Sequence, residues 1–146
     1  MVAASLGNDL ALVELMNHPT FAIESTALAV RQVETLRSID LIDKYGRTAL
    51  LWASYAGQLG TAKILIDHGA NINMGDSDMR TPLMWAATSS RGLAVVELLL
   101  NKGADVFRKD ISGATALHWA KERGNTEVIA LISRKLQAIA AAKGAF

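Results

Sequence analysis

Apolar residues along this chain gather in short blocks that are separated by glycine-containing polar segments. One block contains Ile64, Leu65 and Ile66, and another apolar run spans 95–100. Each predicted helix is about 8–10 residues long, which is shorter than an isolated helix needs to be stable in water. The pattern therefore predicts an all-α protein whose short helices are stabilised by packing on one another.

One short phrase occurs three times, each time at the start of a predicted helix. Its copies are TALLWA, TPLMWA and TALHWA, which begin at Thr48, Thr81 and Thr115, so the copies are 33 and then 34 residues apart. Self-similarity at this interval indicates an array of stacked structural repeats. The threonine is a candidate N-cap, because its hydroxyl can accept a hydrogen bond from a backbone N–H of the first turn.

The segments before the phrase have the composition of tight turns. In DKYG (43–46) and DISG (110–113), Asp can bond its own backbone two residues on and Gly supplies a positive φ. Met79 stands in the place of this glycine in the other copy. Because a positive φ is costly for Met, either this turn takes a different conformation or its local strain has a purpose, and we favour the different conformation. Gly69 and Gly103 stand where the second helix of a repeat should end.

The order of a β-turn, a T-P-L-H-x-A phrase, two antiparallel helices and a G-A-D loop resembles the ankyrin repeat. Residues 40–73, 74–107 and 108–137, which we call the first, second and third units, match it consecutively. The resemblance implies an all-α solenoid of helix-turn-helix units with β-turn fingers, forming one domain over 1–146. It also implies that His118 of the phrase ties neighbouring units together.

The two ends of the array depart from the repeat. Residues 1–16 resemble a truncated N-terminal repeat, and 138–146 would extend the last helix. Residues 17–39 lie where a short loop should join two units, and their apolar spacing predicts an extra helix at approximately 24–37. A degenerate repeat and an inserted helix both fit this segment.

The three tryptophans, Trp52, Trp85 and Trp119, occupy the same position of the phrase. They could form a row of rings that holds a ligand, or they could pack between successive first helices. Packing is favoured, because ankyrin units usually have leucine or tryptophan there. We therefore assign a structural role to the tryptophans, to the three threonines of the phrase, to His118 and to two glycines, Gly69 and Gly103.

Composition excludes several classes of function. Fifteen basic and fourteen acidic side chains give a net charge of +1, which does not favour nucleic acid binding. The chain has no cysteine and no phosphate-binding, nucleophile-elbow or metal-ligand motif, so we expect no catalytic residue, metal or cofactor. The amino terminus does not resemble a signal peptide, and no apolar run approaches the roughly 20 residues that span a bilayer. These features favour a cytoplasmic protein, with secretion as an effector as the alternative.

Ankyrin arrays generally bind other proteins, and stacking at about 10 Å creates a concave surface from the fingers and the first helices. The finger positions that are free to vary are Lys44, Tyr45, Arg47, Ser77, Asp78, Met79, Arg80, Lys109, Ile111, Ser112 and Ala114. On the first helices, the residues expected to face the groove are Tyr55, Thr88 and Glu122. Tyr and Arg are enriched at interface hot spots. We hypothesise that four residues dominate partner binding: Tyr45, Arg47, Tyr55 and Arg80.

The sequence thus predicts a non-catalytic adaptor or regulatory subunit that is monomeric by itself and binds a partner protein through this groove. One alternative is docking or oligomerisation through 17–39. Another is a small-molecule-binding or catalytic protein.

Overall fold

The structure is a computed structural model that describes residues 38–144. The predicted truncated repeat at 1–16 and the predicted helix at 24–37 lie outside the described residues. Of the 17–39 segment, the structure describes only its last residues, which begin the short 3₁₀ helix η2 (Ser38–Asp40).

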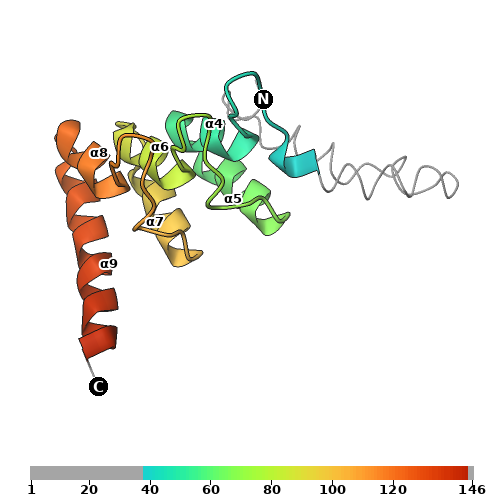
Figure 1. The fold of residues 1–146 in the computed structure, drawn as a ribbon. Coiled ribbons are helices and arrows are strands. Elements are labelled where there is room, and N and C mark those ends of the chain that lie inside the picture. Colours follow the sequence, from blue (N-terminus) through green and yellow to red (C-terminus); the bar gives the residue numbers. More distant parts are fainter. Residues whose placement is uncertain (1–37, 145–146) are drawn as a thin grey trace, which may run out of the picture.

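The described part is built from three helical hairpins, in agreement with the predicted all-α repeat solenoid. Its α-helices, labelled as in Figure 1, are α4 (Ala49–Ala56), α5 (Leu59–Asp67), α6 (Pro82–Thr88), α7 (Leu93–Asn101), α8 (Ala116–Glu122) and α9 (Thr126–Gly144). The inner helices α4, α6 and α8 pack side by side in one layer, and the outer helices α5, α7 and α9 form the second. Each inner helix also packs on the outer helix that follows it.

The repeated phrase begins each inner helix in the same way. Thr48, Thr81 and Thr115 are the N-cap residues, and each hydroxyl accepts a hydrogen bond from the backbone N–H three residues later at 3.3–3.4 Å. The small residue after each tryptophan is fully buried, as Ala53 and Ala86 show. Alanine at this position lets neighbouring inner helices approach closely, and it leaves the larger indole at the edge of the layer.

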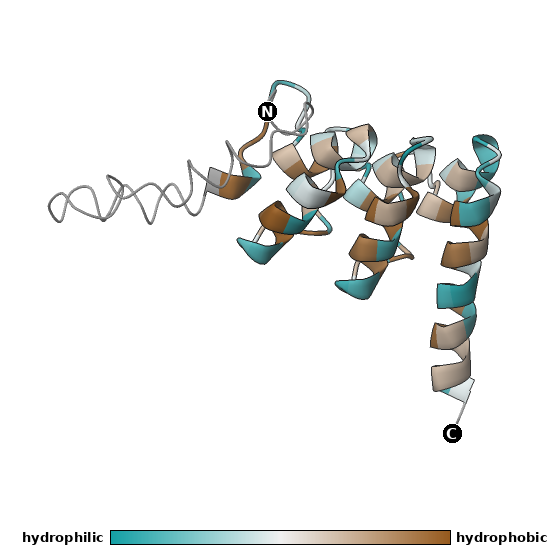
Figure 2. Cartoon of the chain, turned by 180° about the vertical axis from the view of Figure 1, so that it is seen from behind, coloured by the Kyte–Doolittle hydropathy of each residue, from teal (hydrophilic) through white to brown (hydrophobic). Residues whose placement is uncertain are grey.

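The outer helices bury one face against the inner layer. Leu65 and Leu99 are at most 1% exposed, and Gly69 and Gly103 follow the two helices with φ of 90° and 87°. α9 covers the predicted long last helix, and Figure 2 shows apolar and polar segments alternating along it. Within residues 38–144, no helix combines the length and the apolar content needed to cross a membrane.

The β-turn fingers of consecutive units are joined by backbone hydrogen bonds. The N–H of Ser77 donates to the carbonyl of Tyr45 at 3.1 Å, and the N–H of Ile111 donates to the carbonyl of Asp78 at 3.0 Å. These bonds fix the register of the fingers, so that equivalent side chains of neighbouring units lie next to one another.

The expectation that the Met79 turn differs from the others is wrong. Met79 has a φ of 60°, and its N–H donates to the Asp76 carbonyl at 2.8 Å, as Gly46 and Gly113 do in their own fingers. The turn keeps its shape because the Asp76 carboxylate and the bonds between fingers hold it. The strain of a left-handed methionine is therefore tolerated within an otherwise ordinary finger.

Met79→Gly is expected to raise the free energy of unfolding by roughly 0.5–1 kcal/mol, because relief of the left-handed strain exceeds the entropic cost of glycine. Urea denaturation followed by circular dichroism measures the change. Gly113→Met is the reciprocal control, because nothing lies within 4 Å of a Cβ at that position. It should lower stability by a similar amount, and a stabilising effect there would contradict the argument.

Candidate protein-binding cleft

The site begins with the aspartate that opens each finger: Asp43, Asp76 and Asp110. In each finger, one carboxylate oxygen accepts the backbone N–H groups two and four residues ahead, at 2.8–3.0 Å. This oxygen shapes the finger, as the turn sequences predict. The second oxygen remains able to accept a hydrogen bond from a side chain.

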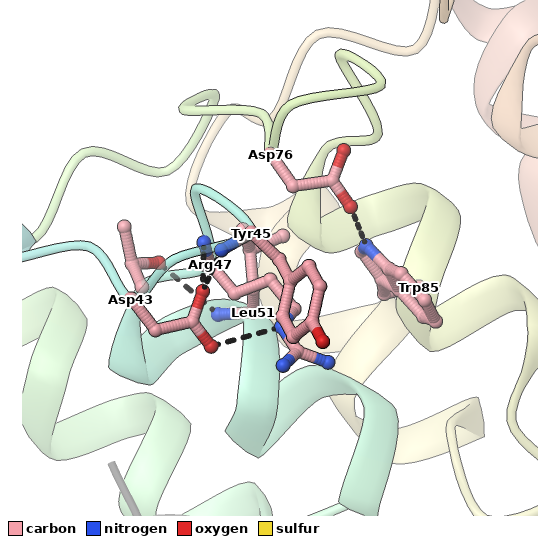
Figure 3. A network of polar contacts seen from close by, with 7 residues as sticks. Asp43, Tyr45, Arg47, Leu51, Asp76 and Trp85 are labelled. Carbon is pink, nitrogen blue, oxygen red and sulfur yellow. Dashed lines mark hydrogen bonds and ion pairs between the residues drawn. The ribbon is translucent and has the colours of Figure 1, made fainter.

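In the second and third units this second oxygen binds the tryptophan of the same unit. Trp85 Nε1 donates to Asp76 Oδ2 at 2.9 Å, and Trp119 Nε1 donates to Asp110 Oδ2 at 2.9 Å. The bond fixes the orientation of each indole at the surface of the inner layer. Figure 3 shows the Asp76–Trp85 bond beside the finger of the first unit.

In the first unit the second aspartate oxygen accepts a hydrogen bond from an arginine instead. Asp43 Oδ2 accepts a hydrogen bond from Nε of Arg47 at 2.9 Å, and the two side chains form an ion pair (Figure 3). Trp52 Nε1 is consequently buried without a hydrogen-bond partner among the described residues. This difference between units could not be predicted from the phrase, because all three units carry the same aspartate and tryptophan.

The arginines of the two fingers therefore lie differently against the rings. The Arg47 guanidinium is 4.2 Å from the Trp52 ring centre and 4.5 Å from that of Tyr45, so it stays over its own unit. The Arg80 guanidinium is 5.6 Å from the Trp85 ring and 4.6 Å from the Trp119 ring, so it lies between two units. Contacts of this kind stabilise a cation by about 0.5–1 kcal/mol at exposed sites.

These two placements leave one cleft open and close the next. The open cleft, between the first and second units, has a volume of about 240 Å³ and is lined by Arg47, Leu51, Trp52, Tyr55 and Trp85. We call it the aromatic cleft.

The equivalent space between the second and third units has a volume of about 10 Å³, because Arg80 occupies the gap between the two indoles. Its lining residues are the positional equivalents of the first set: Arg80, Met84, Trp85, Thr88 and Trp119. At the mouth of the open cleft, the Tyr55 ring stands edge-on to Trp85 at 5.3 Å.

A larger hollow of about 650 Å³ adjoins the cleft at the loops that join the helices of each unit. Its lining is mostly polar and includes Ser90, Arg91 and Arg123, with Tyr55 shared between the two spaces. Among the described residues, no three acidic or histidine side chains lie close enough to hold a metal ion.

Most of the sequence-predicted binding residues are accessible. Those that the structure leaves exposed are Lys44, Tyr45, Tyr55, Ser77, Asp78, Met79, Lys109, Ile111, Ser112 and Glu122. Arg47, Arg80 and Thr88 are partly buried at the aromatic cleft or at its closed equivalent. Ala114 is 8% exposed, so its prediction as a free surface position is wrong: it packs beneath the third finger, where its N–H donates to Asp110.

The predicted tying role of the His118 imidazole is not seen in residues 38–144. The side chain is exposed, its ring stands edge-on to Trp119 at 5.9 Å, and only its backbone N–H bonds Thr115 Oγ1, at 3.4 Å. The imidazole faces solvent and the tryptophan of its own unit, so it joins no two units in the part of the chain that the structure describes.

The tryptophans lie at the border of core and surface. All three are partly buried, and Trp119 packs on the apolar core, whereas Trp52 and Trp85 form two walls of the aromatic cleft. This cleft could not be predicted from the sequence, because it depends on whether the second aspartate oxygen accepts a hydrogen bond from arginine or from tryptophan.

The pKa of the Asp110 carboxyl shows how tightly a finger is built. Burial by itself raises this pKa, but hydrogen bonds from the Ser112 hydroxyl, the Ala114 N–H and the Trp119 indole outweigh burial and hold the pKa below its ordinary value. A carboxyl with a lowered folded-state pKa stabilises the protein above its unfolded pKa of about 3.9, and this contribution is lost as pH falls through the folded pKa.

Asp110→Asn is therefore expected to lower the free energy of unfolding most at neutral pH, with the difference from the parent chain shrinking as pH falls below about 4. Urea denaturation at a series of pH values measures it. Glu97→Gln, at an exposed position of α7, is the control for loss of one charge. A difference for Asp110→Asn that is constant between neutral and acid pH would contradict this account.

Comparison with known proteins agrees with the fold. The family described as "Ankyrin repeats (3 copies)" matches residues 1–110. The chain is 38% identical over 88 residues to a protein named palmitoyltransferase AKR1 from Candida glabrata, which covers 60% of this chain and 11% of that protein. It is 32% identical over 114 residues to a putative ankyrin repeat protein of Rickettsia bellii, which covers 77% of this chain and 63% of that protein.

Mouse inversin is 36% identical over 100 residues, covering 65% of this chain and 9% of that protein. The chain thus spans about a tenth of the length of the palmitoyltransferase and of inversin. Of these three names, only that of the Rickettsia bellii protein refers to ankyrin repeats. On the extent of the family match, this chain belongs to the ankyrin-repeat family.

Proposed function

We propose that this chain is a non-catalytic binding module, an adaptor or regulatory subunit, that holds a partner protein against its fingers and inner helices. Ankyrin repeats are generally protein-interaction modules, which supports the class of function. The observation that carries the proposal for this surface is the open aromatic cleft. It offers two indoles, a phenol ring and a guanidinium, the side chains that most often dominate protein interfaces.

The exposed rings beside the cleft support the same proposal. Tyr45 is 53% exposed and Tyr55 is 52% exposed, although both could bury their rings against a partner. Burial of such aromatic area on binding is a large source of affinity, and two χ angles are all that each ring must fix. The partner is a protein rather than nucleic acid or a membrane, and the unbound chain is a cytoplasmic monomer in this proposal.

Affinity capture from the native host tests the proposal with one variant that carries Tyr45→Ala, Arg47→Ala, Tyr55→Ala and Arg80→Ala. Capture of the specific partner should fall at least about 100-fold, because each truncated hot spot typically costs more than 1 kcal/mol. The matched control carries four changes at exposed positions of the outer helices: Lys63→Ala, Glu97→Ala, Arg134→Ala and Gln137→Ala.

Both variants must keep the circular dichroism spectrum of the parent chain. Undiminished capture by the first variant would show that the aromatic cleft is not the binding surface. A third variant that lacks residues 20–38 tests the alternative in which 17–39 docks the partner. Loss of capture with that deletion alone, or a change in sedimentation, would favour this alternative.

A further inference from the structure

The first and second fingers share one backbone conformation but hold their side chains in two arrangements. In each finger the aspartate accepts, through one oxygen, the backbone N–H groups two and four residues ahead. Its own N–H donates to the carbonyl of the arginine, Arg47 or Arg80, at 3.1 Å. The tryptophan of each unit follows the aspartate by nine residues. The two arrangements therefore differ by rotation of side chains and not by the path of the chain.

Among the described residues, each arrangement pairs one donor with the second oxygen of the aspartate and leaves another buried donor unpaired. In the first unit Asp43 Oδ2 accepts a hydrogen bond from Arg47 Nε, and Trp52 Nε1 is the donor without a partner. In the second unit the aspartate accepts a hydrogen bond from Trp85 Nε1, and Arg80 Nε is the donor without a partner. The cost of an unpaired buried donor is therefore present in both arrangements.

Contacts between the guanidinium and aromatic rings are also present in both arrangements. Arg47 lies over the rings of its own unit, at 4.5 Å from Tyr45 and 4.2 Å from Trp52. The Arg80 guanidinium lies 5.6 and 4.6 Å from the indoles of the second and third units. The ion pair between Arg47 and Asp43 favours the first arrangement only modestly, because both side chains are partly exposed to water. Neither arrangement is thus strongly favoured over the other.

The third unit shows which bond forms when no arginine competes for the aspartate. Ala114 stands at the arginine position, and Trp119 Nε1 donates to Asp110 Oδ2 at 2.9 Å. The bond from tryptophan to aspartate thus forms both without an arginine and, in the second unit, beside one. The first unit is the departure from this pattern within the described part of the chain.

Tyr45 is the feature of the first finger that favours this departure. Its ring contacts the Arg47 guanidinium, whereas Asp78 and Ser112 stand at the same position of the other two fingers and offer no ring. A cation over an aromatic ring is stabilised, so the Tyr45 ring holds the arginine over the first unit. Loss of that ring favours the arrangement of the second unit.

We infer that Arg47 gates the aromatic cleft by exchanging between these two arrangements. In the open state, which the structure shows, Arg47 is bound to Asp43. In the closed state Arg47 enters the space between Trp52 and Trp85, as Arg80 enters the next gap, and Trp52 Nε1 donates to Asp43 Oδ2 instead. The open space of about 240 Å³ accommodates the guanidinium, and Arg80 leaves only about 10 Å³ of the equivalent space unfilled.

A gate of this kind sets the affinity of the cleft. A partner side chain and the Arg47 guanidinium need the same space, so occupation of the cleft selects the open state, and closure weakens binding in proportion to the open fraction. This consequence rests on the proposed function. The gate itself is measured on the unbound chain, so the gate and the proposed function can fail separately.

Nitrogen–proton NMR of the tryptophan indoles tests the gate, because a hydrogen bond to a carboxylate moves an indole N–H proton downfield. In the parent chain the Trp52 signal should lie upfield of the signals of Trp85 and Trp119, whose indoles bind aspartates. Replacement of each tryptophan in turn by phenylalanine assigns the three signals.

The first variant removes the arginine that competes with the indole. In a chain with Arg47→Met the second oxygen of Asp43 loses its donor, so the Trp52 signal should move downfield into the range of the other two indoles. Arg80→Met is the matched control, because Trp85 already donates to its aspartate and its signal should stay in place.

The second variant keeps Arg47 and removes the ring that holds it. Tyr45→Asp gives the first finger the residue of the second, and the ratio of closed to open chains should rise about 2- to 5-fold through loss of one cation–ring contact. The Trp52 signal should shift downfield, and nuclear Overhauser contacts between the Arg47 side chain and the Trp85 ring should strengthen. Tyr45→Phe retains the ring and should leave these signals as in the parent chain.

A Trp52 signal that stays upfield in the Arg47→Met chain overturns the inference, because the arginine then does not compete with the indole for Asp43. Equal indole spectra of the Tyr45→Asp and Tyr45→Phe chains overturn it as well. If the gate fails in this way while the four-residue cleft variant loses its captured partner, the proposed function stands. If the indole signals move as expected while that variant still captures its partner, the gate stands and the proposed function fails.

Discussion

Gly92→Ala is expected to lower the free energy of unfolding by about 3 kcal/mol, at the upper end of what an overpacked methyl group typically costs. A Cβ at this position would lie 1.9 Å from the carbonyl oxygen of Ala86 and 2.8 Å from its carbonyl carbon. Both contacts are with backbone, so no side chain can move aside. Relief requires a shift of the loop that joins α6 to α7, in the middle of the stack.

The matched control for this change is Gly103→Ala. Gly103 has a φ of 87° but nothing within 4 Å of the methyl group that alanine would add, so alanine there incurs only the left-handed strain, about 1–2 kcal/mol. Gly92 has a φ of −82°, and its cost comes from contact alone. Urea denaturation of both variants separates the two costs. A loss for Gly92→Ala that is smaller than that for Gly103→Ala would show that the loop relaxes easily.

The repeat and its helices can be predicted because they depend on features that recur in every unit. A threonine N-cap and a buried alanine after tryptophan each have a local physical cause that acts in all three units, and a glycine with positive φ follows the outer helix in the first two. The helical hairpins that the sequence predicts within residues 40–137 are accordingly present in the structure. The need for Gly92 was not predicted, because it arises from the approach of two backbone segments.

Met79 shows how neighbouring units override a local preference. Its side chain disfavours a positive φ, yet the finger is held by the Asp76 carboxylate and by hydrogen bonds to the fingers on both sides. Each contact is worth about as much as the strain, and there are several of them. The conformation of one turn was thus decided by its neighbours.

The aromatic cleft follows from a competition that the sequence does not resolve. In the first two fingers, both an arginine and a tryptophan lie within reach of the second oxygen of the aspartate, whereas the third finger has Ala114 in the place of the arginine. In the first unit the arginine binds and remains over its own tryptophan. In the second unit the tryptophan binds, and the arginine fills the next gap. The same residue types therefore give one open cleft and one closed one.

Trp85→Ala tests whether a tryptophan of the phrase serves packing or only a ligand. Trp85 lines the aromatic cleft, donates a hydrogen bond from Nε1 to Asp76 and contacts the Tyr55 ring. Because the ring is partly buried, the free energy of unfolding should fall by about 3 kcal/mol, the low end of the range for large aromatic truncations. Capture of the partner protein should also be lost. A stability loss below about 1 kcal/mol with binding abolished would instead assign the ring to the ligand.

Replacement by phenylalanine separates the ring from its N–H group. Trp85→Phe keeps an apolar wall but removes the donor to Asp76 Oδ2, so it should lower stability by about 1 kcal/mol beyond the effect of the smaller ring. Trp52→Phe is the matched control, because Trp52 Nε1 has no partner among the described residues and its removal leaves no acceptor unpaired. The difference between the two variants in urea denaturation isolates the aspartate–indole bond. If the two variants lose the same amount of stability, the aspartate–indole bond does not hold Trp85 in place. The difference between the hydrogen bonds of Asp43 and Asp76 then cannot be what keeps the aromatic cleft open.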